Sequence, residues 1–180
     1  AIGKVPKGKA VRRDGAKPGD ILMVTGPLGG SILGHHLDFK PRLDVSGIIR
    51  EAQASAMIDI SDGLSLDLWR ICEASGCGAL LEVNNIPIAP EAHRETDLTN
   101  AGLRTATPLE HALTDGEDFE LLFAIEPEKS RQLLAMWPDQ APPPFAIGHC
   151  IGEQGVFLNG KEGISRFQPR GWEHHFNTTN

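Results

Sequence analysis

The sequence contains no long hydrophobic run, because its apolar stretches are short and are interrupted by polar residues, glycine or proline. A membrane-spanning helix needs roughly 20 consecutive apolar residues, so a membrane is not an expected partner. The basic, glycine-containing beginning, residues 1–19, also lacks the apolar segment of a secretion signal. These absences favour a cytoplasmic protein.

Cysteine is scarce, with only Cys72, Cys77 and Cys150 in the chain. Their number is odd, and their spacing does not match a zinc knuckle. We interpret them as buried or incidental thiols of a protein from a reducing cytoplasm.

Positive charge is also limited: 17 Lys and Arg stand against 24 Asp and Glu, which gives a net charge of −7. A surface that follows nucleic-acid phosphates needs a basic stripe, and none is visible, so nucleic acid is not an expected partner. No Ser-His-Asp or Cys-His arrangement can be placed as a nucleophilic centre either.

What is present is typical of a folded, loop-rich domain: 40% hydrophobic residues, 20 glycines and 13 prolines. Strand and helix patterns are mixed without strict alternation, which predicts an α+β sandwich over residues 21–180. Residues 1–20 are expected to form an extended, solvated arm, or an arm that touches phosphate in a parent protein. The chain does not begin with Met, and we expect it to be a fragment of a longer protein.

Hydrophobic periodicity and turn residues predict the individual elements. The Gly-rich turn at 26–31 could cradle a phosphate, but it lacks the Lys-Ser/Thr of a Walker loop, and close packing explains its glycines equally well. The expected elements are a strand at 21–25, a helix from that turn to residue 36 or 37, a helix at 44–56, a strand at 57–60, a helix at 64–75 ended by Gly76, a strand at 78–83, a helix near 90–95, a strand at 119–125, a helix at 126–137, strands at 145–151 and 155–158, and a hairpin turn at Asn159-Gly160.

The most informative segment is Asp59-Ile60-Ser61-Asp62-Gly63-Leu64, which lies between a predicted strand and a predicted helix. Backbone N–H groups at a helix start favour anions, and two nearby carboxylates favour Mg²⁺, so the segment suits a metal–phosphate site. Alternatively, Ser61 or Asp62 is a simple N-cap and Asp67 an ordinary acid of the first turn.

A second acidic segment, Asp115-Gly116-Glu117-Asp118, directly precedes a hydrophobic strand. It is either a solvated hairpin turn, which is the common meaning of Asp-Gly between apolar runs, or a set of acids facing a ligand. The chain end, Gly171 to Phe176, could place Trp172 over a ligand, or it could simply pack or fray. His174 and His175 are adjacent and point in different directions, so paired metal ligation is not expected.

The two acidic segments in this order resemble bacterial thiamine-monophosphate kinases. Other stretches agree with this family, namely residues 13–20, 24–29, 74–79 and 171–176. The resemblance therefore extends over nearly the whole chain. The resemblance implies a three-layer-like α/β sandwich with a mixed sheet, the C-terminal domain of the aminoimidazole ribonucleotide synthetase-like superfamily. It also implies that an N-terminal ATP-binding domain is missing, and that the full-length protein is a homodimer.

The resemblance also implies the site. Mg²⁺ would be bound by two aspartates, the ATP triphosphate by a serine, and thiamine monophosphate by acids and an aromatic chain end. The residues at the matching positions are Asp59 and Asp62 for Mg²⁺, Ser61 for ATP, Glu117 and Asp118 for the substrate, and Trp172, with Phe176 as second choice, for the thiamine rings. The doubled His174-His175 departs from the family ending, which more often has one His before the final Phe, so the register of this aromatic contact stays open between Trp172 and Phe176.

The implied reaction is direct in-line transfer of the γ-phosphoryl group of ATP to thiamine monophosphate, giving thiamine diphosphate and ADP. The acceptor is already an anionic phosphate, so no strong general base is required. Three alternatives stay open: a sister enzyme such as aminoimidazole ribonucleotide synthetase or selenophosphate synthetase, an isolated domain that catalyses nothing alone, and an interaction module with an exposed apolar patch.

Overall fold

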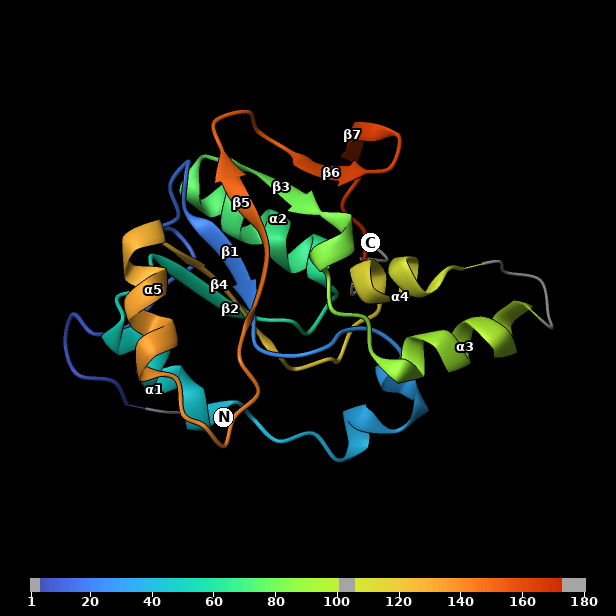
Figure 1. Ribbon diagram of the computed structural model, residues 1–180, viewed down its shortest axis with the longest axis horizontal. Coiled ribbons are helices and arrows are strands. Elements are labelled where there is room, and N and C mark those ends of the chain that lie inside the picture. The colour runs from blue at the N-terminus through green and yellow to red at the C-terminus, as the bar shows by residue number, and fades with distance from the viewer. Residues whose placement is uncertain (1–3, 101–105, 173–180) are drawn as a thin grey trace, which may run out of the picture.

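The computed structural model describes residues 4–100 and 106–172 (Figure 1). Seven strands form one sheet in the order β2-β4-β1-β5-β3-β6-β7. The strands are β1 (Ile21–Val24), β2 (Ala56–Asp59), β3 (Gly78–Glu82), β4 (Leu121–Ile125), β5 (Phe145–Ile151), β6 (Val156–Gly160) and β7 (Gly163–Phe167). The helices are α1 (Leu43–Glu51), α2 (Leu64–Ser75), α3 (Pro90–Asn100), α4 (Pro108–Thr114) and α5 (Pro127–Met136), with 3₁₀ turns η1 (Ser31–Leu33), η2 (His35–Leu37) and η3 (Val83–Asn85).

The sheet is mixed, because β3 and β6 pair in parallel while the other neighbouring strands are antiparallel. Alternate residues of a strand face opposite sides, and β4 shows both sides buried. Leu122 packs in the core that contains α2, whereas Phe123 packs in the core that contains Val45 of α1 and Leu133 of α5. Helices therefore cover both faces of a mixed sheet, which confirms the predicted sandwich.

Helix α2 begins and ends where the sequence predicts, and Gly76 terminates it in the left-handed region at φ 69°. The predicted helix between residues 26 and 37 is wrong: two short 3₁₀ turns replace it. Gly29, Gly30 and Gly34 adopt positive φ values of 89°, 76° and 131° there, which an α-helix cannot accommodate.

Two turn assignments also need correction. The hairpin between β6 and β7 exists, but Asn159 and Gly160 belong to β6 and the turn lies at residues 161–162. Asp115-Gly116 is not a hairpin turn, because helix α4 precedes it. That helix begins with a capping box in which Thr107 and Glu110 satisfy each other's backbone N–H groups.

The arm before β1 is only partly solvated. Residues 4–10 are exposed, but Arg12 accepts a 3.0 Å hydrogen bond from Met57 N–H, and Ala16 N–H donates to Ser75 Oγ at 3.1 Å. Ala16 is buried in the core beside α2. The second half of the arm is therefore part of the folded domain, contrary to the expectation of a fully solvated segment.

The three cysteines are free and buried, as predicted. Burial raises the pKa of Cys72 to about 12, so its thiol stays protonated at neutral pH. None of the helices in the described part of the chain combines the length and apolar character that crossing a membrane requires.

Candidate functional site

The two acidic segments lie side by side just beyond the paired ends of β2 and β4. Ile60 N–H donates to Glu120 O at 2.8 Å, and Phe119 N–H donates back to Ile60 O at 2.8 Å. Glu117 N–H then donates to Ser61 O at 2.9 Å. Antiparallel pairing of β2 with β4 thus brings together residues almost sixty positions apart in the sequence.

The end of the described chain joins them. Trp172 N–H donates to Asp62 O at 2.9 Å, and Ser65 Oγ donates to Arg170 O at 2.7 Å. Gly171 is required for this approach, since a Cβ atom at this position would lie 1.9 Å from Asp62 O. The C-terminal segment is therefore held against the first acidic motif by backbone contacts.

These segments line a pocket of about 740 Å³. Four of the sequence-predicted site residues reach it, namely Ser61, Asp62, Glu117 and Trp172. The other residues that line the pocket come from η1, α3, the end of α4, the second acidic loop and the C-terminal segment: Ser31, Ile32, Glu95, Thr114, Asp115, Gly116, Phe119 and Gly171.

The N-cap interpretation of Ser61 and Asp62 is wrong, because Gly63 is the N-cap of α2 and the cap makes no side-chain hydrogen bond. Instead, the fully buried Asp67 accepts from Ser61 N–H at 3.0 Å and from Asp62 N–H at 2.9 Å. Arg70 donates to Asp67 at 2.7 Å and also pairs with the Asp62 carboxylate. Burial raises the pKa of Asp67, while these donors oppose that effect. The network fixes the Asp62 backbone and side chain at the pocket wall.

Asp59 occupies a different environment. It is the last residue of β2, which is an edge strand of the sheet, and its side chain is exposed. Asp59 is not among the residues that line the 740 Å³ pocket. Phe176, the other predicted aromatic contact, lies outside the described residues.

Asp118 faces away from Glu117 into a second cavity of about 450 Å³ beside the Gly-rich turn. Both of its carboxylate oxygens accept from Gly29 N–H, at 3.0 and 3.1 Å. Burial raises the pKa of Asp118 to about 8; the Gly29 hydrogen bond opposes this shift, and the nearby carboxylates add to it. Glu117 and Phe119 flank it with positive φ values of 64° and 54°, so the loop turns sharply and separates the neighbouring side chains.

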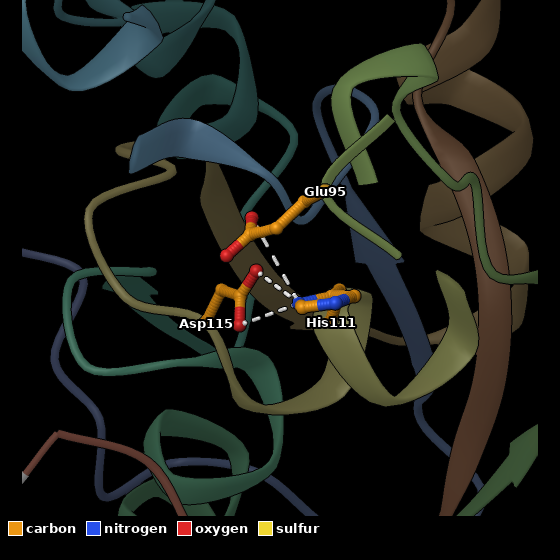
Figure 2. Close-up of side chains that lie close together, drawn as sticks. All are labelled: Glu95, His111 and Asp115. Carbon is orange, nitrogen blue, oxygen red and sulfur yellow. Dashed lines mark hydrogen bonds and ion pairs between the residues drawn. The ribbon is translucent and has the colours of Figure 1, made fainter. Parts of the chain in front are cut away.

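The structure brings Asp115 of the second acidic segment together with two residues that the sequence did not single out, Glu95 and His111 (Figure 2). His111 and Asp115 are four residues apart, a spacing that places both on one face of a helix end. The Thr-Pro-Leu-Glu sequence at 107–110 is typical of a helix start, so the sequence could have predicted the helix that brings His111 and Asp115 together.

The fold and the site define a class: an α+β domain whose mixed sheet carries an acidic pocket closed by its C-terminal segment. The chain belongs to the family described as AIR synthase related protein, C-terminal domain, which matches residues 17–161.

Known relatives share more than the fold. The chain is 40% identical over 166 residues to a thiamine-monophosphate kinase from Rhodopirellula baltica, covering 90% of this chain and 50% of that protein. A thiamine-monophosphate kinase from Methanospirillum hungatei is 36% identical, covering 97% and 57%. The chain spans about half the length of the curated relatives it matches.

Solved structures are also similar to this chain over about half of their own length. The structure described as AaThiL complexed with AMPPCP and TMP superposes with a TM-score of 0.73 at 29% identity, covering 92% of this chain and 54% of that one. The hydrogenase maturation protein HypE of E. coli also gives a TM-score of 0.73, covering 98% and 56%, but at 20% identity this shows a shared fold only.

Proposed function

We propose that this chain is part of a thiamine-monophosphate kinase, which transfers the γ-phosphoryl group of ATP directly to thiamine monophosphate. The observation that carries the proposal is the convergence of Ser61, Asp62, Glu117 and Trp172 in one pocket from three separate segments. The relatives' names support the activity, and the AMPPCP and TMP bound by the AaThiL structure support ATP and thiamine monophosphate as the two substrates.

Within this proposal Asp59 and Asp62 bind Mg²⁺, which would neutralise charge on the ATP phosphates. The residues fit such an ion chemically, because both are carboxylates and Asp59 is exposed at the strand end. Arg70 pairs with the Asp62 carboxylate and holds its orientation.

The remaining residues position the substrates. Ser61 contacts the triphosphate, and Glu117, which is exposed at the tip of its loop, lies near thiamine monophosphate. Trp172 is 64% exposed and lines the pocket, and we assign it to stack on the thiamine rings, with Phe176 as the second candidate. Asp118 acts from the adjacent cavity by fixing Gly29 of the Gly-rich turn. Phosphoryl transfer depends on such positioning and charge neutralisation more than on a general base.

The whole protein would include an N-terminal ATP-binding domain, would form a homodimer and would act in the cytoplasm. The coverage of the relatives supports a missing domain, since this chain spans only 50–57% of them.

The test uses the full-length protein with Asp62→Asn and Glu117→Gln, and follows thiamine diphosphate formation. We expect Asp62→Asn to lower kcat by roughly 100-fold or more, because a ligand of the Mg²⁺ that would neutralise the ATP phosphates is lost. Glu117→Gln should mainly raise KM for thiamine monophosphate. Asp139→Asn, an exposed loop carboxylate outside the pocket, is the matched control. Unchanged activity after replacing both Asp59 and Asp62 by alanine would refute the proposal.

A further inference from the structure

The Glu95, His111 and Asp115 side chains form a cluster that the proposed kinase reaction does not use (Figure 2). Glu95 comes from α3, His111 from α4, and Asp115 directly follows α4. Among residues 4–100 and 106–172, these three form the one group of three or more His, Cys, Asp or Glu residues whose ligand atoms all lie within 4.8 Å of one another.

The separations suit a small cation. His111 Nδ1 lies 3.0 Å from Asp115 Oδ2 and 3.8 Å from Glu95 Oε2. Around a tetrahedral ion with bonds of roughly 2.0–2.1 Å, ligand atoms are about 3.3–3.4 Å apart. The observed distances lie on both sides of that value, so a small side-chain adjustment brings all three atoms to an ion.

The ligand atoms are held in place by the surrounding fold. Asp115 Oδ2 accepts a 3.0 Å hydrogen bond from Gly30 N–H of the Gly-rich turn. His111 is only 5% exposed, and Gly29 packs so closely on the α4 backbone that an added Cβ would lie 2.7 Å from Ala112 N. Support of this kind orients metal ligands and raises affinity.

The cluster also concentrates negative charge. Burial raises the pKa of Glu95, and the Asp115 carboxylate raises it further, while His111 opposes the effect. Asp115 and Glu95 contribute to the raised pKa of Asp118 as well. A bound divalent cation would stabilise these carboxylates in their ionised form.

We propose that Glu95, His111 and Asp115 bind one divalent transition-metal ion of the Zn²⁺ type. An imidazole nitrogen with two carboxylates favours such an ion over Mg²⁺, which prefers oxygen ligands alone. Glu95 and Asp115 also line the 740 Å³ pocket, so an ion bound by them would be accessible from the pocket to water or an oxyanion. The site is separate from the proposed Mg²⁺ pair, Asp59 and Asp62, and does not rest on the kinase proposal.

The test is metal binding by the 180-residue chain after chelator dialysis. We expect calorimetry to show one equivalent of Zn²⁺ bound, and Co²⁺ to give visible absorption typical of a low-symmetry site with nitrogen and oxygen ligands. A millimolar excess of Mg²⁺ should not displace Zn²⁺. Glu95→Gln, His111→Gln and Asp115→Asn should each weaken Zn²⁺ binding by at least about 10- to 100-fold, the loss typical when even a supporting contact of a metal site is removed.

Two controls lie on α3: Glu91→Gln, one turn before Glu95, and His93→Gln, an exposed histidine. Both should bind Zn²⁺ like the wild type, as should Asp62→Asn, which separates this site from the proposed kinase site. Circular dichroism tests whether each variant is folded. If His111→Gln is unfolded, the Glu95 and Asp115 variants test the proposal by their Zn²⁺ affinity. The proposal is overturned if no stoichiometric Zn²⁺ binding occurs, if the three variants bind like the wild type, or if the His111 Nδ1 resonance does not shift on Zn²⁺ addition.

Discussion

Asp118 is a buried acid whose protonation should make the stability of the domain depend on pH. Its folded-state pKa of about 8 lies far above the ordinary value of 3.8, so folding favours the protonated form. The stabilising effect of this group is therefore fully present below about pH 4 and is lost as the pH rises through about 8.

The expected result is a change in the relative stability of Asp118→Asn, which cannot ionise. Between about pH 4.5 and 8.5 the free energy of unfolding of the variant should rise relative to wild type by roughly 2–5 kcal/mol, since each unit of pKa shift is worth about 1.4 kcal/mol. Urea unfolding of the 180-residue chain, with chelator present, measures this. Asp139→Asn should follow the wild-type pH profile, and an Asp118→Asn profile parallel to wild type would contradict the assignment.

Single residues also show how much the sequence alone could reveal. The family resemblance proposed Asp62, Ser61 and Glu117 as site residues, and the structure places all three around one pocket. The role of Asp67 could not be predicted: the N-cap alternative made it an ordinary acid of the first turn, whereas its complete burial and its bonds to two backbone N–H groups depend on the packing of α2.

At the scale of elements, the placement of the C-terminal segment depends on a glycine. A Cβ at Gly171 would clash with the Asp62 carbonyl oxygen, so Gly171→Ala should displace Trp172 from the pocket. In the full-length protein we expect KM for thiamine monophosphate to rise by roughly 10-fold, about 1.4 kcal/mol of lost binding, with little change in KM for ATP.

The matched control is Gly152→Ala, because a Cβ at Gly152 meets no atom within 4 Å. It should leave both KM values unchanged. If Gly171→Ala behaves in the same way, the C-terminal segment does not contribute to substrate binding.

Elements with a strong hydrophobic periodicity were predicted well. Elements whose conformation depends on glycines with positive φ, or on contacts between distant residues, were not. Helix α2 has an apolar face and a terminal glycine, so its limits could be read directly. The 3₁₀ turns η1 and η2 replaced a predicted helix because three glycines adopt positive φ. Helix α4 was not predicted, although its capping box is visible in the sequence, and so the pairing of His111 with Asp115 at its end was not predicted either.

At the scale of the whole molecule, the chain is about half of the relatives it matches, and we expect it to fold but not to catalyse. Asp59 is exposed at a sheet edge, and Leu37 and Leu43 are 81% and 78% exposed, which leaves both the site and an apolar surface open to solvent. The 180-residue chain should form no thiamine diphosphate above background in an assay where the full-length protein turns over. Robust turnover by the chain alone would show that its own residues suffice.

The sequence by itself determined the local properties of this protein: the strands and helices that have a clear apolar period, which acids follow one another, and which family motifs are present. Only the tertiary structure decided that Asp118 turns away from Glu117, that Asp67 rather than a cap residue holds the first motif, and that Glu95, His111 and Asp115 meet. The physical reason is that these features arise from sheet pairing, burial and backbone hydrogen bonds between residues far apart in the chain, which no local pattern encodes.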